Sequence, residues 1–229
     1  MHRFAQMLFM LILAAGLTAC GDRFPDFNYR MTIHVGDDAY SSVRRVEQEK
    51  VTSIVDSSGS TVRRSLQGEA VIIDHPNGRT YYALLSKPGD ADYATLIVGV
   101  ALSPHISDVS QSGGHLDEIA ARSRAMTEVE GPRELPRQIP SRTGRPPYEA
   151  WPMFVTFADP SDPTTVREVD PEDIGVSKIT IEITDEDVTT GIEERLPTFG
   201  PEFEIWVRGL KYGDPRLGIL GGFHQGTDQ

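Results

Sequence analysis

Cysteine is nearly absent from this sequence, since Cys20 is the single cysteine among 229 residues. An internal disulfide would need a second thiol, so any folded domain must be held together by its core alone. Basic residues are also scarce, with 22 Lys and Arg against 34 Asp and Glu and a net charge of −12. This balance argues against binding to nucleic acid and against docking on anionic lipids through basic patches, but it permits a basic protein partner.

The N-terminal apolar run, from Phe4 to Ala19, falls short of the roughly 20 residues that a membrane-spanning helix needs. It follows a short positive start at Met1–Arg3 and ends in small residues. This three-part layout is typical of a secretory signal. The alternatives are an anchor that is never cleaved and a core helix, which is disfavoured because no matching polar face lies nearby.

The apolar run closes on Leu17-Thr18-Ala19-Cys20, which resembles the lipobox of bacterial lipoproteins. The resemblance implies that Cys20 is acylated, that signal residues 1–19 are removed, and that the mature chain begins at Cys20. Two or three acyl chains anchor a protein stably, whereas one chain binds a membrane only marginally. We therefore predict a periplasm-facing protein held by Cys20 in the cell membrane or outer membrane, and Gly21 after the cysteine favours the outer membrane.

The rest of the chain is predicted to comprise a tether at 20–28 and a single β-rich globular domain at 29–229. The first strand is expected at 29–35, where apolar and polar residues alternate. The next segment, 41–55, carries many charges, among them Arg44 and Arg45, and is predicted to be a solvated, edge-like strand. Segments 61–66 and 69–74 are expected to form a strand pair or one bent strand, with Gly68 as a bulge.

Further strands and two helices complete the predicted fold. Asn77-Gly78 between two apolar runs predicts a hairpin, and strands are expected at 153–157, 165–169 and 179–183. Residues 92–103 are apolar nearly all round and form either a buried helix or a strand, while 116–126 shows clear helical spacing. The predicted fold class is α+β, a mainly antiparallel β-sheet with one or two helices packed on one side.

Residues 131–152 form a proline-rich segment that carries the basic patch of this acidic chain. Arginine pairs well with carboxylates, and Tyr and Trp are enriched in interface hot spots. We predict that this segment binds an acidic envelope protein or an acidic face of a second copy, and the alternative is a solvated crossover. The candidate partner-binding residues are Arg133, Arg137, Arg142, Arg145, Tyr148 and Trp151.

No catalytic constellation is visible in the sequence. Asp74 and His75 precede the hairpin turn, but no serine or cysteine stands in a nucleophile elbow. Asp37 and Asp38, like the acids at 185–187, lack the further ligands that a calcium or transition-metal site needs. We therefore predict a binding or structural module with no cofactor, no metal and no catalytic residue. The alternative is a periplasmic hydrolase or ligand-binding protein whose site is built from residues distant in sequence.

Several segments after the anchor are similar to a recurring pattern in bacterial proteins of unknown function. These segments are 68–71, 83–85, 155–163, 169–173 and 184–197. The resemblance covers most of the globular part and implies a shared fold, and it brings no activity, substrate or catalytic residue.

Overall fold

The computed structural model describes residues 24–52, 60–106, 114–140, 146–196, 208–211, 219 and 222–226. The signal run, the lipobox with Cys20, and the candidate residues Arg142 and Arg145 lie outside the described residues. Within the described part, no helix combines the length and the apolar character needed to cross a membrane.

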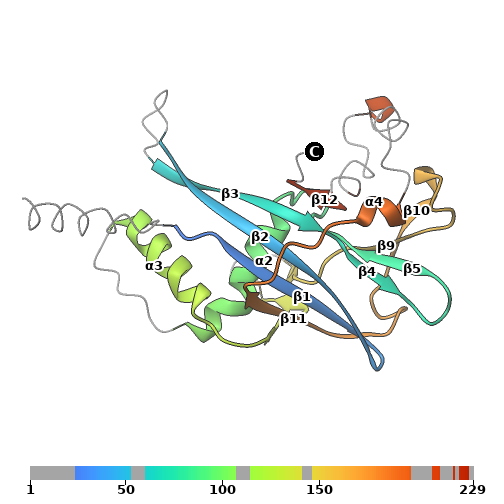
Figure 1. Cartoon of the computed structure of the whole chain (residues 1–229), viewed down its shortest axis with the longest axis horizontal. Helices are drawn as coiled ribbons and strands as arrows, with labels where there is room; N and C mark the ends of the chain where they lie inside the picture. Colours follow the sequence, from blue (N-terminus) through green and yellow to red (C-terminus); the bar gives the residue numbers. More distant parts are fainter. Residues whose placement is uncertain are drawn as a thin grey trace, which may run out of the picture.

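Six antiparallel strands form the larger sheet, and β1 (Phe27–Val35) lies near its centre (Figure 1). Every second residue of β1 is buried, including Tyr29, Met31 and Ile33, while the residues between them are partly exposed. The predicted amphipathic strand is thus confirmed. The order is β12 (His224–Gln225), β3 (Ser60–Glu69), β2 (Asp38–Thr52), β1, β11 (Val176–Thr184) and β6 (Arg133–Glu134).

A second, smaller sheet holds four antiparallel strands in the order β10 (Val166–Val169), β9 (Phe154–Phe157), β5 (Thr80–Ala83) and β4 (Val71–Asp74). The β4–β5 hairpin is confirmed, because Asp74 pairs with Thr80 and Gly78 takes the left-handed backbone angle that its turn requires. A separate two-stranded ribbon pairs β7 (Gln138–Ile139) with β8 (Tyr148–Glu149).

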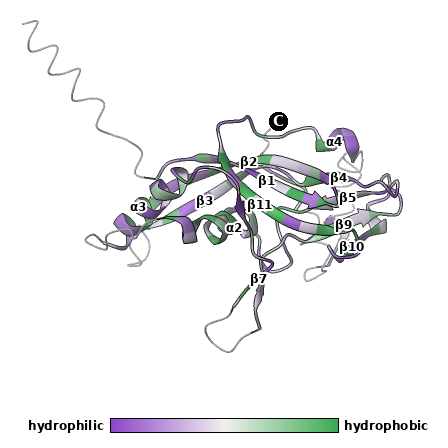
Figure 2. Cartoon of the chain, turned by 90° about the horizontal axis from the view of Figure 1, so that it is seen from below, coloured by the Kyte–Doolittle hydropathy of each residue, from purple (hydrophilic) through white to green (hydrophobic). Residues whose placement is uncertain are grey.

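Two helices, α2 (Tyr93–Leu102) and α3 (His115–Thr127), lie on the same side of the larger sheet (Figure 2). Both predicted helices are therefore confirmed, and residues 92–103 form a helix rather than a strand. Helix α2 buries Ile97, Val98 and Leu102 in the main core, which it shares with the inner face of β1. The shorter elements are η1 (Ser103–His105), η2 (Pro163–Thr165) and α4 (Ile192–Arg195). The fold is α+β and mainly antiparallel, as predicted.

Strands β3 and β4 belong to different sheets, and the chain bends between them at Ala70. This arrangement matches the bent-strand alternative and not the strand pair. The β2–β3 register runs without a shift from Ser60 to Gln67, so no bulge interrupts it before Gly68. The bend brings the second sheet against a smaller apolar cluster that includes Tyr82, Phe157 and Phe223.

Two predictions about the start of the domain are wrong. Phe24 and Phe27 are buried, so the globular part includes residues that were assigned to the tether. Strand β2 is not an edge strand, because it pairs with β1 on one side and β3 on the other. Its Arg44 is fully buried, since this part of β2 faces the main core and not solvent.

Candidate functional site

A cavity of about 670 Å³ opens where the 131–152 segment meets the second sheet. It contains two of the predicted partner-binding residues, Arg137 and Trp151, together with Lys87, which sequence reasoning did not single out. We call it the Lys87 pocket, and its lining comprises Lys87, Pro88, Arg137, Glu149, Trp151, Pro152, Met153, Phe154, Glu168, Val169, Asp170 and Pro171.

Lys87 is held in place by its own turn and by two aromatic rings. The backbones of Lys87 and Asp90 bond to each other at 3.1 and 2.9 Å, and Gly89 between them takes a left-handed angle. The Lys87 ammonium donates to the Glu149 carbonyl at 2.6 Å. It also lies 4.6 Å from the centre of the Tyr93 ring and 5.4 Å from that of Tyr148. These contacts hold the Lys87 ammonium at a fixed point of the pocket.

Burial lowers the pKa of Lys87 to about 8, although the carboxylates of Glu149, Asp90 and Glu168 act in the opposite direction. Desolvation disfavours the charged amine more than these partners favour it. The ammonium is therefore short of compensating negative charge. An anionic ligand group placed beside Lys87 would supply that charge.

The predicted partner-binding residues that the structure describes are mostly engaged within the chain. Arg137 is 33% exposed and forms ion pairs with Glu149, Asp170 and Glu172. Its guanidinium also lies 5.5 Å from the centre of the Trp151 ring. An acidic partner would have to compete with three carboxylates for the Arg137 guanidinium. The binding of an acidic partner to the 131–152 segment stays a prediction.

The neighbouring candidates have structural contacts of their own. Trp151 is 8% exposed and donates its indole N–H to the Leu135 carbonyl at 3.0 Å. Arg133 donates to the Glu130 carbonyl at 2.9 Å, three residues back along the chain. Tyr148 is 41% exposed, and its hydroxyl donates to the Asp90 carboxylate at 2.7 Å. The contact between Tyr148 and Asp90 thus joins β8 to the Lys87 turn beside the pocket.

The lining of the Lys87 pocket also carries negative charge. Glu168 is exposed on β10, and its carboxylate forms no hydrogen bond or ion pair with the described part of the chain, although its negative charge acts on Lys87. Asp170 follows two residues later, and its carboxylate accepts the backbone N–H of Glu172. Met153, Phe154 and Trp151 add apolar groups to the same lining. A ligand with a positive end, a negative end and an apolar body matches this arrangement.

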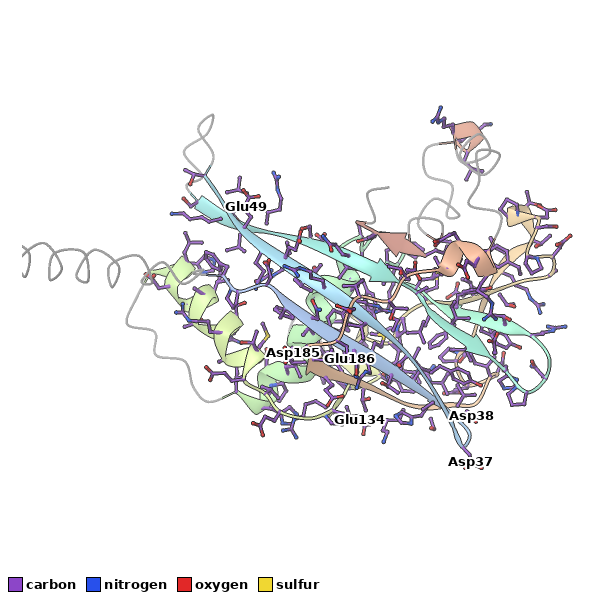
Figure 3. The ribbon with its side chains drawn as sticks, in the orientation of Figure 1. Asp37, Asp38, Glu49, Glu134, Asp185 and Glu186 are labelled. Atoms are coloured by element: carbon purple, nitrogen blue, oxygen red, sulfur yellow. The ribbon has the colours of Figure 1, made fainter. Side chains whose placement is uncertain are left out.

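The acidic pairs that the sequence raised as metal candidates lie apart from the pocket. Figure 3 shows Asp37 and Asp38 at the tip of the β1–β2 hairpin, far from Asp185 and Glu186. Glu186 forms an ion pair with Arg30. Across the described ranges, no three His, Cys, Asp or Glu side chains gather into a group that could hold a metal ion.

Asp74 and His75 serve the hairpin turn. The Nδ1 atom of His75 accepts the backbone N–H of Asn77 at 3.1 Å. Asp74 accepts the Thr80 hydroxyl at 3.0 Å and pairs with Arg195, whose guanidinium lowers the pKa of Asp74. Both side chains thus stabilise the turn in which they lie.

Comparisons with known proteins found no match. No protein-family model matches the chain. No curated protein and no solved structure gives a significant match. The similarity to a bacterial pattern of unknown function and the lipobox resemblance therefore stay predictions.

Proposed function

We propose that the chain is a lipid-anchored cell-envelope protein that binds a small zwitterionic ligand, such as a short peptide, in the Lys87 pocket. The anchor is supported by the signal-like run and by Leu17-Thr18-Ala19-Cys20 at its end. The binding role is supported by one observation above all: Lys87 and Glu168 line the same cavity, together with the apolar residues Met153, Phe154 and Trp151.

The charges of the pocket favour a ligand that carries both signs. The positive charge of Lys87 is not fully compensated by nearby carboxylates, and Glu168 has no ion-pair partner in the described residues. A purely anionic ligand would meet Glu149, Glu168 and Asp170, and a purely cationic one would meet Lys87 and Arg137. A zwitterion can pair its negative group with Lys87 and its positive group with Glu168, and it avoids both repulsions.

The apolar part of the lining adds a requirement for size. A cavity of about 670 Å³ falls within the range of small-molecule sites, which are commonly 300–1,000 Å³. Trp151, Phe154 and Met153 offer apolar surface to the body of the ligand. A dipeptide with one aromatic side chain carries the two terminal charges and the apolar group in one molecule.

Titration with the dipeptide Ala-Phe tests this proposal. The protein has two tryptophans, so Trp206→Phe leaves Trp151 as the only indole and makes its fluorescence a reporter of the pocket. We expect saturable binding that weakens about ten-fold in Lys87→Met and in Glu168→Gln, because a charge-assisted hydrogen bond contributes about 1.5–3 kcal/mol.

Matched surface variants serve as controls. Lys178→Met and Glu193→Gln make the same charge changes at exposed positions outside the pocket, and they should leave the affinity unchanged. Equal losses in pocket and control variants would show a non-specific charge effect. No binding of Ala-Phe at millimolar concentration would overturn the proposal.

A further inference from the structure

A second cavity, of about 390 Å³, lies at the hairpin end of the smaller sheet. It shares no lining residue with the Lys87 pocket. We call it the Arg79 pocket, and its lining comprises Gly78, Arg79, Thr80, Tyr82, Phe157, Ala158, Pro160 and Arg167.

Two exposed arginines, Arg79 and Arg167, flank this cavity without a partner of their own among the described residues. In that part of the chain, neither guanidinium forms a hydrogen bond or an ion pair.

Three acidic side chains of neighbouring segments are already engaged. Asp74 pairs with Arg195. Asp159 accepts the hydroxyl and the backbone N–H of Ser161, and Asp162 accepts both from Thr164. These carboxylates stabilise their own turns, so the positive charge beside the cavity is left for an external anion.

The sheet brings the two arginines to one place from distant parts of the sequence. Thr156 of β9 pairs with Tyr81 of β5 on one side and with Arg167 of β10 on the other. Arg79 precedes Tyr81 by two residues. Strands spaced by about 4.8 Å put β5 and β10 roughly 10 Å apart, which long side chains can bridge around a small anion.

Aromatic residues Tyr82 and Phe157 line the same cavity as the two arginines. The rings of Tyr82 and Phe157 meet edge to face with centres 5.9 Å apart, and Phe223 packs against both. Tyr82 is 2% exposed, yet its hydroxyl forms no hydrogen bond with any described residue. Burial raises the pKa of Tyr82 to about 12, so the hydroxyl stays protonated at neutral pH and can donate.

We propose that the Arg79 pocket binds a phosphate monoester that carries an apolar or aromatic group. Near neutral pH a phosphate monoester carries close to two negative charges, which two guanidinium groups can match with bidentate hydrogen bonds. The Tyr82 hydroxyl is a further donor to a phosphate oxygen, and the Phe157 ring contacts the apolar group. The shared chemistry has two sources, a free aromatic phosphate and the headgroup of phosphatidic acid.

Calorimetric titration of the detergent-solubilised full-length protein with phenyl phosphate tests this proposal. We expect 1:1 binding, at least ten-fold weaker binding of inorganic phosphate, and no measurable binding of phenol. The Arg79→Gln/Arg167→Gln double variant should lose at least ten-fold in affinity. Tyr82→Phe should lose a smaller factor, since it removes one hydroxyl and keeps the ring. Dihexanoyl phosphatidic acid, added as a competitor, separates a lipid source from a soluble one by its relative affinity.

The control is the Arg63→Gln/Arg124→Gln double variant, which removes the same charge from exposed positions outside the cavity. It should bind phenyl phosphate as the unchanged protein does. An equal loss in the control, equal binding of inorganic phosphate, or no binding at 10 mM phenyl phosphate would each overturn the proposal. The Lys87 pocket takes no part in these measurements, so their failure leaves the zwitterion proposal standing.

Discussion

Gly68 lies directly against Arg44 on the neighbouring strand. A Cβ atom at position 68 would come within 3.0 Å of the Arg44 Cγ atom and within 3.2 Å of its Cα atom. The same glycine has a φ of +137°, which side chains of L-residues rarely adopt. The absence of a side chain at Gly68 therefore makes room for a fully buried arginine in the middle of the sheet.

Gly68→Ala is expected to destabilise the protein by about 3 kcal/mol, because it adds overpacking to backbone strain. Gly36→Ala is the matched control, since Gly36 also has a positive φ but a Cβ atom there would have no other atom within 4 Å. The control should lose only about 1–2 kcal/mol, the cost of the left-handed backbone. Urea unfolding measures both, and equal losses would show that the contact with Arg44 costs nothing.

Arg44→Met is expected to keep or raise the melting temperature. The Arg44 Nη2 atom is buried without a hydrogen-bond partner in the described part of the chain. The guanidinium contacts the Met31 sulfur and the Glu69 carbonyl, and it lies 5.9 Å from the centre of the Tyr29 ring. That carbonyl keeps the Ser42 hydroxyl as a donor after the change. A buried charge without an ion pair costs free energy, so a long apolar side chain should be tolerated.

Arg44→Ala provides the comparison for this position. It leaves a cavity that methionine would fill and should cost about 2–5 kcal/mol. Thermal unfolding of the two variants separates packing from charge. A strong loss of stability in Arg44→Met would mean that the guanidinium itself stabilises the core.

Lys87 should give the protein a distinct alkaline pH dependence. Its pKa is about 8 in the folded protein against 10.5 for an ordinary lysine. Between these values the unfolded chain binds more protons at this residue than the folded one, so the contribution of Lys87 to stability rises with pH. Below about pH 8 both states carry the proton, and the folded state bears the full cost of the buried ammonium.

Urea unfolding at pH 7.5 and pH 9.5 measures this effect. The difference in unfolding free energy between the unchanged protein and Lys87→Met should shift in favour of the unchanged protein at the higher pH. Lys178→Met, at an exposed position, should show no such shift. Parallel behaviour of Lys87→Met and the unchanged protein would contradict the inferred desolvation of the amine.

Cys20→Ser tests the anchor. Because Cys20 is the only cysteine, its loss should leave an unlipidated precursor that keeps residues 1–19. Fatty-acid labelling and the size of the protein in the membrane fraction measure the outcome. Labelling that persists in Cys20→Ser would show that the acyl chains are attached elsewhere.

The sequence predicts the strands, turns and helices that depend on residues close together in the chain. The alternation in β1, the Asn77-Gly78 turn and the helical spacing in α3 each depend on neighbours a few residues away, and the structure confirms all three. The burial of Arg44 cannot be predicted from its neighbours in the sequence, because it depends on the core side chains Met31 and Tyr29 of β1, which lie against its guanidinium.

The pocket lay beyond sequence reasoning for a related reason. Lys87 precedes a Pro-Gly pair and has the sequence context of an ordinary turn, and Glu168 stands in a short polar strand. They line one cavity only because the folded chain places the 131–152 segment beside the second sheet. The sequence predicts a functional role for the 131–152 segment and so includes Trp151 and Arg137 among the candidates. It does not reveal that Arg137 forms ion pairs within its own chain.

The most direct test of the zwitterion site removes one ligand charge at a time. Acetyl-Ala-Phe lacks the ammonium group and therefore tests the contact with Glu168. Ala-Phe amide lacks the carboxylate and therefore tests the contact with Lys87. The Trp206→Phe protein should bind Ala-Phe about ten-fold more tightly than either capped form. Lys87→Met should lose only the preference for the free carboxylate, and Glu168→Gln only the preference for the free ammonium. Equal affinities for the free and capped dipeptides, or variants that lose both preferences equally, would contradict the roles assigned to Lys87 and Glu168.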